Sequence, residues 1–333
     1  MIVSWNTTNR CNMACRHCYR DSGLKRESEL STEEAKKLID ELVLAHFKIM
    51  IFSGGEPFTR PDIFELMEYA RWSGLRPVMG TNGTLITKEN AQKLKEAGVM
   101  GVGISLDSAD SKAHDAFRGL DGAWKMAVDG MKNCREAGVK FQIHTTVMDW
   151  NKDELGKLTD FCVEIGASAH HIFFLIPVGR GKFEKSVEVE KYEELLTGIM
   201  EKQKNINIEI KPTCAPQFIR IAEQVGVDTR FTRGCIAGLS YCVINPMGKV
   251  QPCAYMDMEI GNVRDKPFHE IWESNEVFRK LRTRRYSGGC GDCAFTGKCG
   301  GCRARAMYYH DGDYMAEDNY CLLNSGNRHG RQG

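Results

Sequence analysis

Short apolar runs rich in β-branched residues alternate with longer segments of helical period from residue 2 to about residue 178. The apolar runs predict six strands, at 2–6, 48–53, 76–81, 100–106, 139–147 and 169–176. The segments between them predict five helices, at 32–46, 61–73, 87–97, 123–137 and 151–165. Strands that alternate with helices form parallel βαβ units with right-handed crossovers, and six such units close most of a barrel.

Glycines stand where four of these helices should end, at Gly74, Gly98, Gly138 and Gly166. Polar or glycine-rich segments follow the first four strands: the cysteines of 11–18, GGEP at 54–57, NGT at 82–84 and the segment 105–108. Strand ends and helix N-termini converge at one face of a parallel β/α fold. We therefore expect these four segments to face one another across the barrel mouth.

The pattern changes past residue 180. A polar hinge leads to a helix at about 189–204, a short strand at 206–211 and then a tail rich in glycine and cysteine. We expect a barrel over 1–180, a linker over 181–233, a small metal-stabilised domain over 234–325 and a disordered tail over 326–333.

Composition and charge narrow the classes of partner and the cellular location that we expect. Lys+Arg minus Asp+Glu is 45 − 44 = +1, so charge does not indicate a partner among nucleic acids or anionic membranes. No stretch approaches the roughly 18 apolar residues that cross a bilayer, and the first residues lack a secretory pattern. We expect a cytoplasmic globular protein without a membrane partner.

The chain has 14 cysteines, which in a reducing compartment favour metal ligation or catalysis over disulfides. Cys11, Cys15 and Cys18 form C-x3-C-x2-C, one ligand short of the four thiolates that usually hold a [4Fe–4S] cluster. An iron without a protein thiolate can accept an exogenous ligand. A zinc site with a distant fourth ligand, or a cysteine-rich loop, is the alternative.

The cysteine trio after an opening strand, followed about 35 residues later by GGEP after the next strand, resembles the radical S-adenosylmethionine (SAM) superfamily. The resemblance implies a partial (β/α)6 TIM-like barrel. It implies that Cys11, Cys15 and Cys18 hold three irons of a catalytic cluster while SAM chelates the fourth. One electron then cleaves SAM to a 5′-deoxyadenosyl radical, which takes a hydrogen atom from an unactivated carbon.

The resemblance also implies SAM contacts. His17 stands where the family places a ring near the adenine, and Gly54, Gly55 and Glu56 match the segment that accepts hydrogen bonds from the SAM amino group. Glycines permit close backbone approach, and a carboxylate complements an ammonium. For His17 the alternative is an ordinary loop histidine.

Four further positions resemble the family's SAM-binding residues. Asn82, Ser105 and Arg118 match its ribose- and carboxylate-binding positions, and Leu175 stands where backbone contacts to adenine are expected. Arg118 could instead be a solvated arginine at a helix end, and Leu175 could be a plain core residue.

The C-terminal cysteines resemble the SPASM domain, which holds auxiliary [4Fe–4S] clusters behind radical SAM barrels. The resemblance assigns an inner cluster to Cys235, Cys242, Cys253 and Cys302, and an outer cluster to Cys290, Cys293, Cys299 and Cys321. Only Gly300 and Gly301 separate the last two cysteines of the central run, where the family usually has three residues. Structural zinc is the alternative.

The remaining cysteines lie apart from these sets. Cys134 and Cys162 fall within helical patterns, which predicts buried small hydrophobes. Cys214, in KPTCAP, either faces the cavity as a donor or ligand or has a structural role.

Over residues 1–325 the chain resembles the tetrapyrrole-modifying branch, in segments such as WNTTNRCNMACRHCYR and KPTCAPQFIRIA. That branch contains the anaerobic heme b synthases and the NirJ-type enzymes of heme d1 synthesis. The resemblance implies hydrogen abstraction from a porphyrin propionate, with decarboxylation or removal of that side chain, and a ferredoxin- or flavodoxin-type electron donor. The auxiliary clusters would then be candidate electron acceptors.

Substrate contacts are open at this stage. Arg60, Arg180 and Arg233 are candidates to pair with propionates, and His170 or His171 with the porphyrin iron; loop capping and core packing are the alternatives. A peptide maturase is a second candidate function, although the first predicted strand begins at Ile2 and leaves no room for a leader-binding module ahead of it. A non-catalytic iron–sulfur or zinc module is the third.

Overall fold

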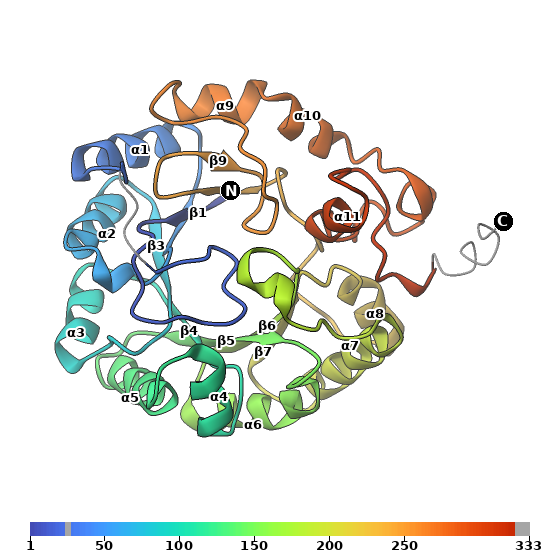
Figure 1. The fold of residues 1–333 in the computed structure, drawn as a ribbon, viewed down its shortest axis with the longest axis horizontal. Helices are drawn as coiled ribbons and strands as arrows, with labels where there is room; N and C mark the ends of the chain where they lie inside the picture. Colours follow the sequence, from blue (N-terminus) through green and yellow to red (C-terminus); the bar gives the residue numbers. More distant parts are fainter. Residues whose placement is uncertain (24–27, 324–333) are drawn as a thin grey trace.

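A curved nine-stranded sheet forms the centre of the molecule, and helices surround its outer face (Figure 1). The computed structural model describes residues 1–23 and 28–323. The strands are β1 (Ile2–Asn6), β2 (Ile49–Ser53), β3 (Arg76–Thr81), β4 (Val102–Ser105), β5 (Phe141–Val147), β6 (Ala169–Phe174), β7 (Glu209–Thr213), β8 (Tyr241–Ile244) and β9 (Val250–Gln251). Their order is β7-β6-β5-β4-β3-β2-β1-β8-β9, parallel throughout except for the antiparallel β8–β9 pair. The sheet is therefore a partial barrel, as predicted, with β7 and β9 at its edges.

Helices α1 to α8 lie between successive strands, and α9 to α11 follow β9. They are α1 (Thr32–Leu44), α2 (Ile63–Trp72), α3 (Lys88–Glu96), α4 (Ser111–Arg118), α5 (Ala123–Glu136), α6 (Leu155–Ile165), α7 (Val189–Gln203), α8 (Phe218–Val225), α9 (Phe268–Ser274), α10 (Glu276–Thr283) and α11 (Arg303–Tyr309). Short 3-10 helices are η1 (Pro57–Thr59), η2 (Lys152–Glu154), η3 (Gly179–Phe183) and η4 (Gly288–Cys290). Within the described residues, none of the helices combines the length and apolarity needed to cross a bilayer.

All six predicted strands are confirmed as β1 to β6, with ends shifted by at most two residues. The five predicted helices are confirmed as α1, α2, α3, α5 and α6; α6 begins later than expected because Lys152–Glu154 form the 3-10 turn η2. The glycines predicted to end helices all have positive φ, between 70° and 97°. At these positions a left-handed residue ends the helix, which a glycine does without steric cost.

The C-terminal part shares the sheet and the core of the barrel. β8 pairs in parallel with β1, from Ile2↔Tyr241 to Trp5↔Ile244, so the sheet crosses the expected boundary at residue 234. Phe47, before β2, packs edge to face on Phe268 and Trp272 of α9, with ring centroids 5.2 and 5.1 Å apart. Helices α9 to α11 complete the ring of helices around the sheet (Figure 1). The division into domains stays a prediction, and the expected disorder of 326–333 falls outside the described residues.

Candidate active site at the barrel mouth

The loop after β1 carries three cysteines into the mouth of the barrel. Cys11, Cys15 and Cys18 all line one cavity of about 280 Å³, together with residues from the ends of β2 to β6. The loop, dark blue in Figure 1, crosses the centre of the ring of helices. The predicted meeting of the strand-end segments at the barrel mouth is thus confirmed.

The glycines of GGEP hold this loop in place. The Gly55 amide donates to the Thr8 carbonyl at 2.8 Å, and the Glu56 amide donates to the Arg10 carbonyl at 2.8 Å. A Cβ on Gly55 would lie 2.1 Å from the Arg10 oxygen, and one on Gly54, whose φ is +140°, would lie 2.6 Å from the Thr8 oxygen. Only glycines allow the two loops to lie this close.

The Glu56 carboxylate points into the protein rather than into the cavity. It accepts hydrogen bonds from the Thr81 hydroxyl at 2.8 and 2.9 Å, from the Asn82 amide at 2.9 Å and from the Phe58 amide at 3.3 Å. Complete burial raises the pKa of Glu56 to about 7, although the hydrogen bonds from these donors lower it. Glu56 therefore fastens the GGEP turn to the end of β3, while Gly54 and Gly55 line the cavity itself.

Burial opposes charge on the Cys11 and Cys15 thiols. It raises the pKa of Cys11 to about 11, with further contributions from Glu56 and the other two thiols, and it raises the pKa of Cys15. The Arg118 guanidinium opposes the shift at Cys15, because its Nη1 lies 3.7 Å from the Cys15 sulfur. Such thiols become thiolates when a cation binds them, which is the requirement for metal ligation.

A buried ion pair orients Arg118. Its Nε and Nη2 lie 2.7 and 2.6 Å from one oxygen of Asp107, whose other oxygen accepts from the Thr146 amide at 2.8 Å. Burial would raise the pKa of Asp107, but Arg118, followed by His17 and His114, holds it below its usual value. Asp107 fixes the guanidinium of Arg118, which is buried and lines the cavity, so Arg118 is not a solvated arginine at a helix end.

Asn82, Ser105, His17 and Leu175 also line the cavity. The side-chain amide of Asn82 donates to Asn12 Oδ1 at 2.8 Å, which joins the end of β3 to the cysteine loop. The His17 ring stacks on Phe117 at 4.7 Å between centroids, and its buried Nδ1 has no hydrogen-bond partner. Burial lowers the pKa of His17 to about 4, so the ring is neutral at pH 7.

Two of the three arginines considered for propionate binding are held by other groups of the protein. Arg180 donates to the carbonyls of Cys15, at 2.9 Å, and Ser22, at 3.0 Å, and therefore braces the cysteine loop. Arg60 forms a bidentate pair with Asp62, at 2.7 and 2.9 Å. Arg233 is exposed.

The histidine that faces the cavity is not one of the two predicted candidates, His170 and His171. His170 is fully buried and satisfied by the hydroxyls of Thr145 and Thr159, at 2.9 and 3.0 Å. His171 stacks on His144 at 5.2 Å, nearly parallel. His144, on β5, lines the cavity, and its buried Nε2 has no hydrogen-bond partner; this histidine was not among the predicted site residues. The inward side of the alternating strand β5 was the available signal.

The C-terminal cysteines fall into two groups. Cys302 belongs to a small core cluster against which Cys214, Cys235 and Cys253 pack, whereas Cys242 lies in the main core, fully buried on β8. Cys290 and Cys321 are buried, Cys293 and Cys299 half-buried, and Cys290 influences the pKa of both Cys299 and Cys321. Gly300 and Gly301 have φ of +71° and +59°, a conformation that accommodates the shortened spacing. Cys134 and Cys162 are buried in the main core, as predicted.

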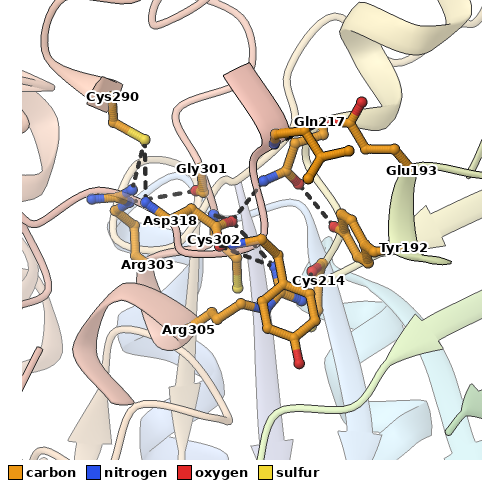
Figure 2. Close-up of polar contacts among 12 residues, drawn as sticks. Tyr192, Glu193, Cys214, Gln217, Cys290, Gly301, Cys302, Arg303, Arg305 and Asp318 are labelled. Atoms are coloured by element: carbon orange, nitrogen blue, oxygen red, sulfur yellow. Dashed lines mark hydrogen bonds and ion pairs between the residues drawn. The ribbon is translucent and has the colours of Figure 1, made fainter. Parts of the chain in front are cut away.

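A buried polar network connects Cys302 of the first group with Cys290 of the second (Figure 2). Asp318 Oδ2 accepts from the Cys302 amide at 2.7 Å, and the Asp318 amide donates to the Cys290 sulfur at 3.4 Å. Arg305 pairs with Asp318 at 3.2 and 3.3 Å, and Arg303 Nη2 lies 3.7 Å from the Cys290 sulfur. Asp318, Arg303 and Arg305 are almost completely buried. None of these was predicted as a functional residue.

The residues at the barrel mouth fit the expected cofactors. Three thiols, two unpartnered buried imidazole nitrogens and a fixed guanidinium face one cavity, which suits a thiolate-bound cluster with a polar organic ligand. In residues 1–23 and 28–323, no group of three or more His, Cys, Asp or Glu side chains is arranged to hold a metal ion. A [4Fe–4S] cluster bridges its ligands through a cube of iron and sulfide, so its thiolates need not converge on one point.

Comparisons with known proteins agree with this geometry. Residues 5–162 match the Radical SAM superfamily, and residues 235–294 match the SPASM iron-sulfur cluster-binding domain. The AdoMet-dependent heme synthase of Methanosarcina barkeri is 42% identical over 98% of this chain and 97% of its own length. That of Nitratidesulfovibrio vulgaris is 43% identical, over 96% and 91%.

Similarity extends to more distant proteins. The pre-heme d1 synthase of Dinoroseobacter shibae is 30% identical over 97% of this chain and 86% of its own length. The solved structure of native anSMEcpe with bound AdoMet has a TM-score of 0.76 and 20% identity, and the match covers 98% of this chain and 94% of that one. At this identity the structural match supports the fold alone.

Proposed function

The chain belongs to the radical SAM superfamily and carries a SPASM domain, and from this membership we propose that it is a heme-forming enzyme that acts on porphyrin propionates. The supporting observation is identity above 40%, over nearly the whole chain, to two AdoMet-dependent heme synthases. Identity to the pre-heme d1 synthase is lower, at 30%, which favours decarboxylation of propionates over their removal. The proposed substrate is Fe-coproporphyrin III.

Cys11, Cys15 and Cys18 are the proposed ligands of the catalytic [4Fe–4S] cluster. With SAM bound, that cluster would supply the 5′-deoxyadenosyl radical. The chain itself contributes a rigid setting: Arg180 holds the carbonyl of Cys15, and the Gly54–Gly55 turn fits against the loop at Thr8 and Arg10. A loop clamped from two sides can keep its thiols in one geometry through turnover.

The proposed SAM contacts use the groups that the fold leaves unsatisfied or charged. Arg118, fixed by Asp107, faces the cavity as a partner for a carboxylate, and the neutral His17 ring offers a stacking face and a free Nδ1. The backbone at Gly54 and Gly55 and the side chains of Asn82 and Ser105 supply polar groups, and Leu175 supplies an apolar wall. Glu56 acts through the turn that it anchors.

We place the enzyme in the cytoplasm, where a ferredoxin- or flavodoxin-type donor would supply the electron. The test is anaerobic incubation with SAM, a reductant and Fe-coproporphyrin III, followed by mass spectrometry. Successive losses of CO₂ from the porphyrin, matched by 5′-deoxyadenosine, are the expected result.

Cysteine variants provide the controls. Cys15→Ala should abolish 5′-deoxyadenosine formation, whereas Cys134→Ala, in the core of α5, should retain it. If the wild type forms 5′-deoxyadenosine but returns the porphyrin unchanged, the tetrapyrrole proposal is wrong, and a peptide substrate becomes the next candidate to test.

A further inference from the structure

We propose that Cys214, rather than Cys242, completes the inner auxiliary ligand set with Cys235, Cys253 and Cys302. The inference rests on the proposed function only in taking the inner site to hold a [4Fe–4S] cluster. Such a cluster needs four ligands, and the SPASM resemblance assigns Cys242 as the fourth.

Packing brings these four cysteines together. Cys214, Cys235 and Cys253 all pack against the small cluster that contains Cys302, between the end of β6 and α11. The side chains of Cys214 and Cys302 lie close enough to interact with each other. Cys253 interacts electrostatically with both Cys235 and Cys302, so no member of the set is remote from the others.

The backbone at Cys214 is held in an unusual conformation. Cys214 directly follows β7, and its φ is +58°, in the left-handed region that side chains with a Cβ rarely adopt. Glycine would occupy such a position without cost. Non-glycine residues persist in this region where the surrounding structure over-determines them, and such positions cluster at functional sites.

A buried network fixes that conformation. Arg305 Nη2 donates to the Cys214 carbonyl at 2.7 Å, and Arg305 is paired with Asp318. Gln217, three residues after Cys214, donates to Asp318 at 2.8 Å, and Asp318 accepts from the Cys302 amide. Figure 2 shows these bonds. One carboxylate thus positions the segments that carry Cys214 and Cys302, from two parts of the chain about 90 residues apart.

Cys242 faces the other way. It lies in the middle of the parallel β1–β8 ladder, opposite Val3, and its side chain is fully buried in the main core between the sheet and the helices. Its neighbour Tyr241 lines the cavity at the barrel mouth. Because successive residues of a strand point to opposite faces, Cys242 points away from that cavity.

Iron content of the reconstituted enzyme tests the assignment. Three clusters correspond to about twelve irons per chain. Cys214→Ala should lower this to about eight, or leave a three-iron cluster with a distinct electron paramagnetic resonance (EPR) spectrum. Cys242→Ala, the matched control, should keep about twelve irons and the wild-type spectrum. Full iron in Cys214→Ala, loss of iron in Cys242→Ala, or about eight irons in the wild type would each overturn the assignment.

A second variant covers the case in which Cys214→Ala does not fold. Cys214→Ser keeps the shape of the side chain but replaces the sulfur, so the Mössbauer parameters of one auxiliary cluster should change; unchanged parameters would overturn the assignment. Neither measurement uses a tetrapyrrole. An enzyme with twelve irons that forms 5′-deoxyadenosine but does not decarboxylate the porphyrin would refute the proposed function and leave the ligand assignment intact.

Discussion

Replacement of Arg305 by methionine should destabilise the protein strongly, because it removes the cation from a buried pair. The Arg305 and Asp318 side chains are 1% and 0% exposed, and Arg305 also lies over the Tyr320 ring at 4.5 Å. Burial would raise the pKa of Asp318, and Arg305 is the main group that holds it below its usual value. Without Arg305, an ionised carboxylate stays buried with only dipolar partners.

Loss of one partner from a buried pair costs about 3–5 kcal/mol. Asp318 keeps three donors in the variant, namely the amides of Cys302 and Tyr320 and the side chain of Gln217, so the lower end of this range applies. At about 2 °C per kcal/mol for a chain of this size, the melting temperature should fall by about 6 °C.

The assay is thermal unfolding of the reconstituted enzyme by circular dichroism, with iron content measured in parallel. Arg264→Met is the matched control: Arg264 also pairs with a carboxylate, Glu34, at 2.6 and 2.9 Å, but the two side chains are 30% and 39% exposed. A surface pair contributes about 1 kcal/mol or less. Arg305→Met combined with Asp318→Asn should recover part of the loss, because the uncompensated charge is gone.

The loss of stability in Arg305→Met should also depend on pH. The lowered pKa of Asp318 gives the wild type stability that is fully present above the ordinary aspartate pKa of about 4 and is lost as pH falls through the lowered value. The difference in melting temperature between wild type and Arg305→Met should therefore be full from pH 7 down to about pH 4 and narrow below pH 4. If Arg305→Met lost no more stability than Arg264→Met at pH 7, the reasoning about the buried pair would be refuted.

Three further predictions concern the barrel mouth and the outer auxiliary cluster. Gly55→Ala should displace the cysteine loop, because the new Cβ would lie 2.1 Å from the Arg10 oxygen, and should lower iron content by about four per chain; Gly156→Ala, where no heavy atom lies within 4 Å, should not, and equal iron contents would contradict the packing argument. The Glu56 pKa of about 7 lies above its unfolded value of about 4.3, so its contribution to stability is present below pH 4.3 and lost as pH rises through 7. Melting temperatures of Glu56→Gln should accordingly vary less between pH 5 and pH 8 than those of the wild type, and parallel curves would count against this. Arg303→Gln should lower the reduction potential of the outer auxiliary cluster, because Arg303 lies 3.7 Å from the Cys290 sulfur and its charge favours the reduced form; an EPR titration with an unchanged midpoint would contradict it.

Much of the fold could be predicted from local patterns. Period-2 and period-3.6 alternation located β1 to β6 and the helices α1, α2, α3, α5 and α6, because the period of each element sets which side chains reach the core. The helix α4, between β4 and β5, was not predicted. The strands β8 and β9 and the short helices α9 to α11 could not be located in this way. They are brief segments whose place depends on contacts with distant partners, such as β1 for β8 and Phe47 for α9.

The sequence by itself determined the chemistry at the barrel mouth, because the cysteine trio and GGEP lie directly after adjacent strands and parallel strands bring their ends together. Only the tertiary structure decided how the side chains are used: it engaged Arg60 and Arg180 internally, turned Glu56 inward and brought Cys214 to Cys302. The physical reason is the distance along the chain between the residues that interact. Spacing along the chain orders groups within one loop, whereas contact between residues 214 and 302 depends on packing and on buried charges such as Arg305 and Asp318, which no local pattern encodes.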